Sequence, residues 1–168
     1  MVSSHALSLV INASPLIALG KAGLLGLLEA DAFRTKIPHA VAKEVLAEKH
    51  GEDATARWLG EKGASKIIPA APPLPDPILL AWNLGAGETS VIAEAGREPA
   101  SIAVLDDRAA RRCAEALGQR CTGTLGFLLM AKRRGLLSEV APAIQAIQSA
   151  GLYLAPDLVK TVLHIAGE

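Results

Sequence analysis

The 168-residue sequence lacks several features that mark particular classes of protein. It has no excess of charge, since 17 basic and 17 acidic residues cancel, and this excludes a protein that coats DNA through a large basic surface. Its two cysteines are too few for a disulfide framework, and no apolar run is long enough to predict a membrane span. The first apolar segment also lacks the preceding basic residues of a signal peptide, so we expect a soluble cytoplasmic protein.

Aromatic residues are scarce as well, at 3%, although 51% of the residues are apolar. This composition predicts an aliphatic core. The length fits one ordinary domain, and we expect residues 1–168 to form it. Residues 69–77 contain five prolines and predict an irregular surface loop rather than a linker between domains, because neither flank looks complete as a domain.

Short apolar segments alternate with helical patterns along the chain. Residues 7–11, 67–68 and 101–105 predict buried strands. Ser14 followed by Pro15 predicts a helix with Ser14 as its N-cap. Further helices are expected over residues 38–49, from 87 onward, and over 107–117, 123–134, 138–149 and 156–165. The alternation predicts an α/β fold with a mostly parallel sheet covered by helices on both faces.

Sites in such folds lie at the carboxyl ends of the strands, where this sequence places polar residues. Asn12 follows the first strand, and Asp106 and Asp107 follow the strand over residues 101–105. Adjacent carboxylates repel each other unless a cation or an arginine compensates. Three arginines follow closely in sequence: Arg108, Arg111 and Arg112. The pair therefore predicts either a functional site or an ordinary acidic helix start.

Two glutamates add further oxygen ligands from distant segments. Glu88 shares a helix face with apolar residues three, four and seven positions later, which favours an ion pair or a bound metal over a simple partner for the helix dipole. Glu44 lies at the margin of an apolar stripe and, taken alone, reads as a surface residue. Oxygen ligands without histidine or cysteine suit Mg²⁺ or Mn²⁺, for which phosphodiester hydrolysis is the natural chemistry. The full set of candidates is Asn12, Glu44, Glu88, Asp106 and Asp107.

Five segments make a resemblance specific. They are VINASPLIAL, IPHAVAKEV, LGAGETSVIAEA, AVLDDRAARRCAEALG and TGTLGFLLMAKRRGLL. Their order resembles the PIN-domain superfamily, in particular its prokaryotic branch related to VapC-type toxins, over nearly the whole chain. The resemblance implies a three-layer α/β/α sandwich with a central, mostly parallel sheet. It also implies a Mg²⁺- or Mn²⁺-dependent endoribonuclease, often paired with an antitoxin.

The same resemblance assigns roles to the candidate residues. Glu44, Glu88 and Asp106 match acidic metal-site positions, and Asp107 lies beside them and could replace or assist Asp106; these four are the expected catalytic residues. The expected metal ligands are Asn12, Glu88, Asp106 and Asp107. The family's usual first acidic residue is Asn12 here, and an amide oxygen can coordinate a cation but lacks the charge that holds it. Ser14 resembles the hydroxyl that supports such a site, or serves only as a helix cap.

RNA contact is expected from a local excess of basic residues between Asp106 and Arg134, where seven basic residues face three acidic ones. Solvated helix faces explain this excess almost as well. The expected RNA-binding residues are Arg108, Arg111, Arg112, Lys132, Arg133 and Arg134. Alanine-rich helices and leucines expected to be exposed over residues 24–28 predict a homodimer.

Two rival functions remain. The departure at Asn12 makes a non-catalytic PIN module plausible, one that binds RNA or a protein partner. A phosphoacceptor domain using Asp106 is the other, and it is disfavoured because it needs an acidic pair after the first strand, where this chain has Asn12 and Ala13.

Overall fold

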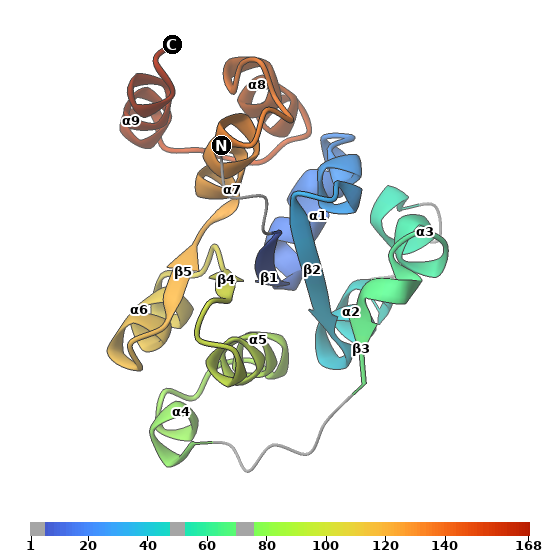
Figure 1. Cartoon of the computed structure of the whole chain (residues 1–168), viewed down its shortest axis with the longest axis vertical. Coiled ribbons are helices and arrows are strands. Elements are labelled where there is room, and N and C mark those ends of the chain that lie inside the picture. The colour runs from blue at the N-terminus through green and yellow to red at the C-terminus, as the bar shows by residue number, and fades with distance from the viewer. Residues whose placement is uncertain (1–5, 48–52, 70–75) are drawn as a thin grey trace.

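A computed structural model describes residues 6–47, 53–69 and 76–168 of the chain. Its centre is a five-stranded, fully parallel sheet in the order β3-β2-β1-β4-β5 (Figure 1). The strands are β1 (Leu7–Ile11), β2 (Phe33–Pro38), β3 (Ile67–Ile68), β4 (Ile102–Val104) and β5 (Arg120–Thr122). The predicted α/β class with a parallel sheet is confirmed.

Helices cover both faces of this sheet and form the outer layers of an α/β/α sandwich. The connection from β1 to β2 through α1 (Ala13–Lys21) and the connection from β3 to β4 through α5 (Ala86–Arg97) run in opposite directions along the sheet. Right-handed connections therefore place these two helices on opposite faces. Helix α5 contacts β1, β2 and β4, whereas α1 contacts α3 (Ala54–Gly60), α7 (Thr124–Arg133) and α8 (Ala141–Ser149). In the described residues the helices are α1 (Ala13–Lys21), α2 (His39–Ala47), α3 (Ala54–Gly60), α4 (Pro77–Ala81), α5 (Ala86–Arg97), α6 (Arg108–Ala116), α7 (Thr124–Arg133), α8 (Ala141–Ser149) and α9 (Pro156–Ala166), with two 3-10 helices, η1 (Leu25–Glu29) and η2 (Ala64–Lys66).

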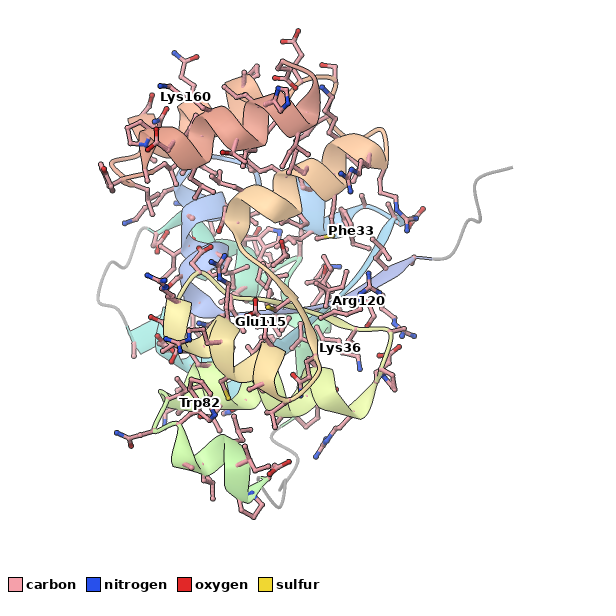
Figure 2. The ribbon with its side chains drawn as sticks, turned by 90° about the vertical axis from the view of Figure 1, so that its left-hand side faces the viewer. Phe33, Lys36, Trp82, Glu115, Arg120 and Lys160 are labelled. Atoms are coloured by element: carbon pink, nitrogen blue, oxygen red, sulfur yellow. The ribbon has the colours of Figure 1, made fainter. Side chains whose placement is uncertain are left out.

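The last three helices gather at one end of the molecule, away from α4 and α5 (Figure 1). A view turned by 90° shows the same arrangement, with Lys160 of α9 and Trp82, which follows α4, at opposite ends (Figure 2). No described helix has the length and apolarity needed to cross a membrane.

The core is aliphatic, as the composition predicts. Strand β1 lies in the middle of the sheet, and Leu9, Val10 and Ile11 have no exposed surface. A strand covered on both faces must be apolar on both, which explains the continuous apolar run in this segment. Phe33 and Phe127 form the one aromatic pair among the described residues, with ring centroids 5.2 Å apart.

Two strands escaped the sequence analysis. Strand β2 buries Phe33, Thr35 and Ile37, and the alternate residues Arg34 and Lys36 pair with carboxylates at the end of α5. Strand β5 has only three residues and begins with an exposed arginine. Both strands lack the continuous apolar run on which the strand predictions relied.

The predicted start of α1 was wrong by two residues. Asn12, not Ser14, is the N-cap, and the helix begins at Ala13. Pro15 then occupies the third helical position, where its missing N–H costs nothing because the first-turn N–H groups have no partner within the helix. Ser14 is exposed on the first turn.

The region around residues 24–28 also differs from the expectation. It forms η1, in which Leu25 and Leu28 are buried and Leu24 and Leu27 pack against the core. The exposed leucines on which the homodimer prediction depended are therefore absent. Of the proline-rich segment, residues 70–75 lie outside the described residues, and Pro77 opens α4 rather than continuing the loop.

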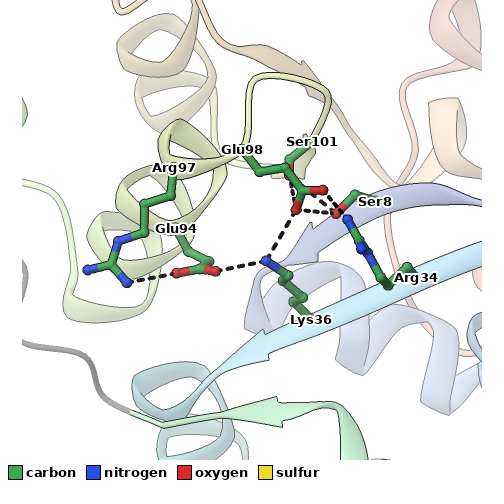
Figure 3. Close-up of polar contacts among 7 residues, drawn as sticks. All are labelled: Ser8, Arg34, Lys36, Glu94, Arg97, Glu98 and Ser101. Carbon is green, nitrogen blue, oxygen red and sulfur yellow. Dashed lines mark hydrogen bonds and ion pairs between the residues drawn. The ribbon is translucent and has the colours of Figure 1, made fainter.

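A polar network holds the C-terminal end of α5 against the first two strands (Figure 3). Lys36 bridges the carboxylates of Glu94 and Glu98, at 3.0 and 3.2 Å. Burial opposes ionisation of Glu98, but hydrogen bonds from Lys36 and Ser8 and the charge of Arg34 outweigh it and lower the pKa of this carboxyl group. The network fixes α5, and the opposite end of this helix carries part of the candidate site. The seven residues drawn are Ser8, Arg34, Lys36, Glu94, Arg97, Glu98 and Ser101.

Candidate metal centre

The side chains of Asn12 and Glu44 converge on the first turn of α5. A Cβ atom placed on Gly87 would lie 2.5 Å from Glu44 Oε2 and 3.1 Å from Asn12 Oδ1. Gly87 is buried, and only the absence of a side chain there lets both oxygens approach the helix. Asn12, directly after β1, and Glu44 of α2 thus bring two oxygen atoms from distant parts of the sequence to one point on α5.

The environment of Asn12 is unusual for a helix N-cap. An N-cap asparagine normally accepts a hydrogen bond from the second or third N–H of its helix. Asn12 makes no such bond, and Pro15 supplies no N–H at the third position. Among the described residues its Oδ1 atom is buried without a hydrogen-bond partner, which costs roughly 1–3 kcal/mol unless another group compensates.

The backbone of Asn12 fixes this side chain beside β4. Its N–H donates to the carbonyl of Val104 at 3.1 Å, which extends the pairing of β1 with β4 by one residue. Asp106 follows two residues after Val104. The carboxyl ends of the two central strands therefore bring Asn12 and Asp106 to the same edge of the sheet, as the sequence predicts.

Asp106 is held by the start of α7. Its Oδ1 accepts from the Thr124 N–H at 2.7 Å, and its Oδ2 accepts from the Thr124 hydroxyl at 2.6 Å. The N-terminus of a ten-residue helix stabilises a negative charge. Each carboxylate oxygen has a second lone pair, so Asp106 is oriented by these contacts and can still coordinate a cation.

Two other candidate carboxylates cap helices. Asp107 is the exposed N-cap of α6 and accepts from the Ala110 N–H at 2.8 Å. Glu88 Oε2 accepts from the Gly85 N–H at 3.2 Å and so caps its own helix, α5, in the manner of a dipole partner. In the described part of the chain, no three His, Cys, Asp or Glu side chains are grouped as a ready-made metal site. Glu88 would have to leave the Gly85 N–H to bind a cation beside Gly87.

The basic candidates fall into two groups. Arg108, Arg111 and Arg112 lie on the first turns of α6 and are exposed at the same edge as Asp106. The second group lies at the other end of α7, about 14 Å along the helix from Thr124. There the Lys132 ammonium binds the Ala166 carbonyl and Glu168, a structural role at the end of α9. The second group is completed by Arg133 and Arg134.

Neither cysteine is a candidate nucleophile at this edge of the sheet. Burial raises the pKa of the Cys113 thiol, and Cys113 has no exposed surface. Burial, followed by the charge of Glu115, also raises the pKa of the Cys121 thiol. Both groups therefore remain protonated and weakly nucleophilic at neutral pH.

Gly87 and Thr124 were missed by the sequence analysis as contributors to this region. Both lie in segments that the sequence analysis singled out, GAGE and TGTLG. A glycine on the buried face of a helix indicates close approach by another group, and a threonine at a helix start indicates a hydroxyl available for a hydrogen bond. Neither signal names the partner, which comes from elsewhere in the chain.

Comparison with protein families agrees with this architecture. A family model described as PIN domain matches residues 8–168, nearly the whole chain. Comparisons with curated proteins and with solved structures gave no match. The match includes all five strands, except for Leu7 at the start of β1, and all of the candidate site residues. On this evidence, the chain belongs to the PIN-domain family, whose members are in general nucleases.

Proposed function

We propose that this chain is a Mg²⁺- or Mn²⁺-dependent endoribonuclease, related to VapC-type toxins, that hydrolyses RNA phosphodiester bonds as the toxin of a cytoplasmic toxin–antitoxin pair. Membership of the PIN-domain family supports the nuclease class. The observation that carries the proposal is the convergence of Asn12 Oδ1 and Glu44 Oε2 at Gly87, on the edge of the sheet that also carries Asp106.

The residues at this edge fit a hard divalent cation. The buried Oδ1 of Asn12 lacks a hydrogen-bond partner within the described residues, and a cation would satisfy it. Glu44 supplies negative charge beside it, and Asp106 supplies a second oriented carboxylate. An all-oxygen set of this kind suits Mg²⁺ or Mn²⁺ rather than zinc. When bound, the cation would neutralise phosphate charge and make a water molecule more acidic.

The protein's own residues would orient the substrate and the ligands. Thr124 fixes both oxygens of Asp106, which is the kind of outer support that sets ligand geometry. Arg111 is exposed beside Asp106 and is available to pair with a phosphate of the RNA backbone. Glu88 and Asp107 would join the site by exchanging their helix-capping bonds for the cation, and Ser14 would support it from the first turn of α1.

The direct test is metal-dependent cleavage of single-stranded RNA by the purified protein. We expect cleavage in Mn²⁺ or Mg²⁺ that EDTA abolishes, and a loss of at least about 100-fold in Asp106→Asn and Glu44→Gln. Asp31→Asn is the matched control, because Asp31 is an exposed acidic residue before β2, at the opposite edge of the sheet. Cleavage that survives EDTA, or that Asp31→Asn reduces as much as Asp106→Asn does, contradicts the proposal.

The toxin role has a separate test in cells. Induced expression of the wild-type chain should arrest growth, and Asp106→Asn should relieve the arrest at equal protein level. A small DNA-binding protein encoded in the adjacent reading frame should relieve it as well when expressed together with the chain. If the purified chain cleaves RNA but its expression leaves growth unaffected, the nuclease proposal stands and the toxin role is wrong.

A second candidate is a PIN module that binds RNA or a protein without cleaving. Two observations favour it: Asn12 brings no charge to the cation site, and the Glu88 carboxylate is engaged by the Gly85 N–H. A chain of this kind binds single-stranded RNA in the presence of Mn²⁺ and leaves it intact. Cleavage that Glu88→Gln abolishes would exclude it.

A further inference from the structure

The chain has a single exposed aromatic side chain. All five aromatic residues lie in the described part, where Phe33, Trp58 and Phe127 are buried and Trp82 is half-buried. Tyr153, between α8 and α9, is 86% exposed. The Tyr153 ring therefore exposes a large apolar surface to solvent and does not contribute to the core.

Tyr153 lines a cavity that also reaches the candidate site. The cavity has a volume of about 660 Å³, within the range of pockets that bind small ligands. Asp106, Thr124 and Arg111 line it together with Tyr153. Tyr153 and Asp106, far apart in sequence, therefore line the same space.

The part of the cavity formed by α9 is apolar. Leu158, Val162 and Ile165 lie on one face of this helix, at spacings of three and four residues, and all three line the cavity. Val162 is buried, but Leu158 and Ile165 remain 50% and 52% exposed. The apolar face of α9 is thus only partly covered by the residues that the structure describes.

The part of the cavity nearest Asp106 is polar and carries charges of both signs. A Cβ atom placed on Gly123 would lie 3.0 Å from Asp106 Oδ1 and 3.4 Å from Arg111 Nη1, so the guanidinium group lies close to the carboxylate. Glu115, on the same helix as Arg111, also lines the cavity and is labelled in Figure 2. One cavity is therefore lined by a guanidinium group, an oriented carboxylate, an exposed tyrosine and the apolar face of α9.

A nucleotide of single-stranded RNA has matching parts: a flat base with an apolar face, and a phosphate with a negative charge. Single-stranded RNA is commonly bound by stacking its bases on aromatic side chains while arginines contact the phosphates. We propose that this cavity binds one base next to the phosphodiester bond held at Asp106, with the base stacked on Tyr153 and the adjoining phosphate paired with Arg111. This assignment rests on the proposed function, and it makes Tyr153 a positioning residue for the substrate.

The test uses short fluorescein-labelled single-stranded RNAs and the full-length chain. Binding is measured by fluorescence anisotropy in EDTA, where no metal-dependent cleavage occurs, and kcat and KM are measured separately in Mn²⁺. The variants are Tyr153→Ala, Tyr153→Phe and, as a matched control, Ile78→Ala, because Ile78 is an exposed apolar residue on α4 at the opposite end of the molecule. Each RNA is also made with one abasic nucleotide, placed in turn at every position.

We expect Tyr153→Ala to raise Kd and KM by about 5- to 150-fold, the value of one stacked base, with a smaller change in kcat. Tyr153→Phe should retain wild-type binding, because the ring stacks without its hydroxyl, and Ile78→Ala should bind normally. An abasic nucleotide at one position should weaken wild-type binding by a similar factor and cause no further loss in Tyr153→Ala.

Other results overturn the assignment. If Tyr153→Ala binds RNA as tightly as the wild type, or if every abasic RNA loses the same affinity, no base is bound in this cavity. This conclusion holds even if the wild type cleaves RNA. Loss of a co-purifying protein from Tyr153→Ala, with RNA binding intact, shows that a protein partner occupies the surface instead. If the wild type cleaves no RNA and yet loses affinity for the RNA that is abasic at one position, that result supports the base-binding site and contradicts only the nuclease proposal.

Discussion

Replacing Asn12 with aspartate would test the candidate cation site through the charge that this chain lacks. In N12D a second carboxylate oxygen would stand where Asn12 Oδ1 now stands, facing Glu44 Oε2 across the space beside Gly87. Asn12 is 4% exposed, whereas Glu44 is exposed, so water would screen the pair in part, from the side of Glu44. Without a cation the two charges repel each other, and with a cation both attract it.

The size of the repulsion is bounded by the geometry. The two oxygens lie 2.5 and 3.1 Å from one Cβ position on Gly87, so they are at most about 5.6 Å apart. Two unit charges at that separation interact with about 1–3 kcal/mol at effective dielectric constants between about 60 and 20, the range that fits a pair with one exposed partner. A loss of that size lowers the Tm of a chain of this length by about 2–12 °C. Repulsion also raises the pKa of the introduced carboxyl group above its unfolded-state value. N12D should therefore match the wild type most closely in mild acid, where the new group is protonated, and lose stability as the pH rises toward neutrality.

The assay is thermal unfolding of wild type and N12D with EDTA and with increasing Mn²⁺. We expect N12D to melt lower in EDTA and to gain more from Mn²⁺, because the added carboxylate tightens cation binding by roughly 100-fold for each 3 kcal/mol of attraction. In EDTA, the double variant N12D/E44Q should melt at the temperature of the wild type, because only one of the two facing groups is then charged. Equal melting of N12D and wild type in both conditions would refute the convergence of these two side chains on a cation.

Three further predictions address neighbouring groups. Gly87→Ala places a Cβ atom 2.5 Å from Glu44 Oε2 and should weaken Mn²⁺ binding at least tenfold by calorimetry, with stability within about 1 kcal/mol because alanine favours the helix; Gly60→Ala, with open space around it, should leave Mn²⁺ binding unchanged. Thr124→Val removes the hydroxyl that binds Asp106 and should lower cleavage about 10- to 100-fold while the chain stays folded by circular dichroism. Hydrogen bonds from the Lys132 ammonium and from the backbone N–H groups of Val140 and Ala141 lower the pKa of Glu168 from 4.5 to about 2. Its stabilising effect should therefore be complete above pH 4.5 and lost as the pH falls toward 2, a dependence that urea unfolding should find missing in Glu168→Gln.

The sequence predicts the frame of this molecule better than its side-chain contacts. Strand β1 is recognisable because a strand buried on both faces is mostly apolar, with Ser8 as its one polar residue, and β4 is recognisable for the same reason. Strand β2 was missed because its outward positions carry Arg34 and Lys36, which interrupt the apolar run. The carboxyl-end rule for parallel strands then brings Asn12 and Asp106 to one edge, and the structure agrees.

The directions of the side chains could not be predicted in the same way. An asparagine before a helix reads as a cap, yet Pro15 removes one of its usual donors and the Asn12 oxygen faces Glu44 instead. Glu88 lies close to the predicted face of its helix, but its carboxylate turns back to the Gly85 N–H. Both outcomes depend on competition between nearby hydrogen-bond donors, which periodicity does not describe.

The neutral charge of the chain bears on how it would recognise RNA. A strongly basic protein attracts nucleic acid over long distances and binds it with little regard to local fit. This chain has no net charge to do so, and Lys132, at the far end of α7, is already engaged by Glu168. Affinity for RNA would then depend on local groups, among them the exposed Arg111 at the sheet edge and the exposed Tyr153 between α8 and α9. Recognition that depends on two such groups favours single-stranded RNA, because a base paired within a duplex cannot leave its stack to reach Tyr153 without an energetic cost.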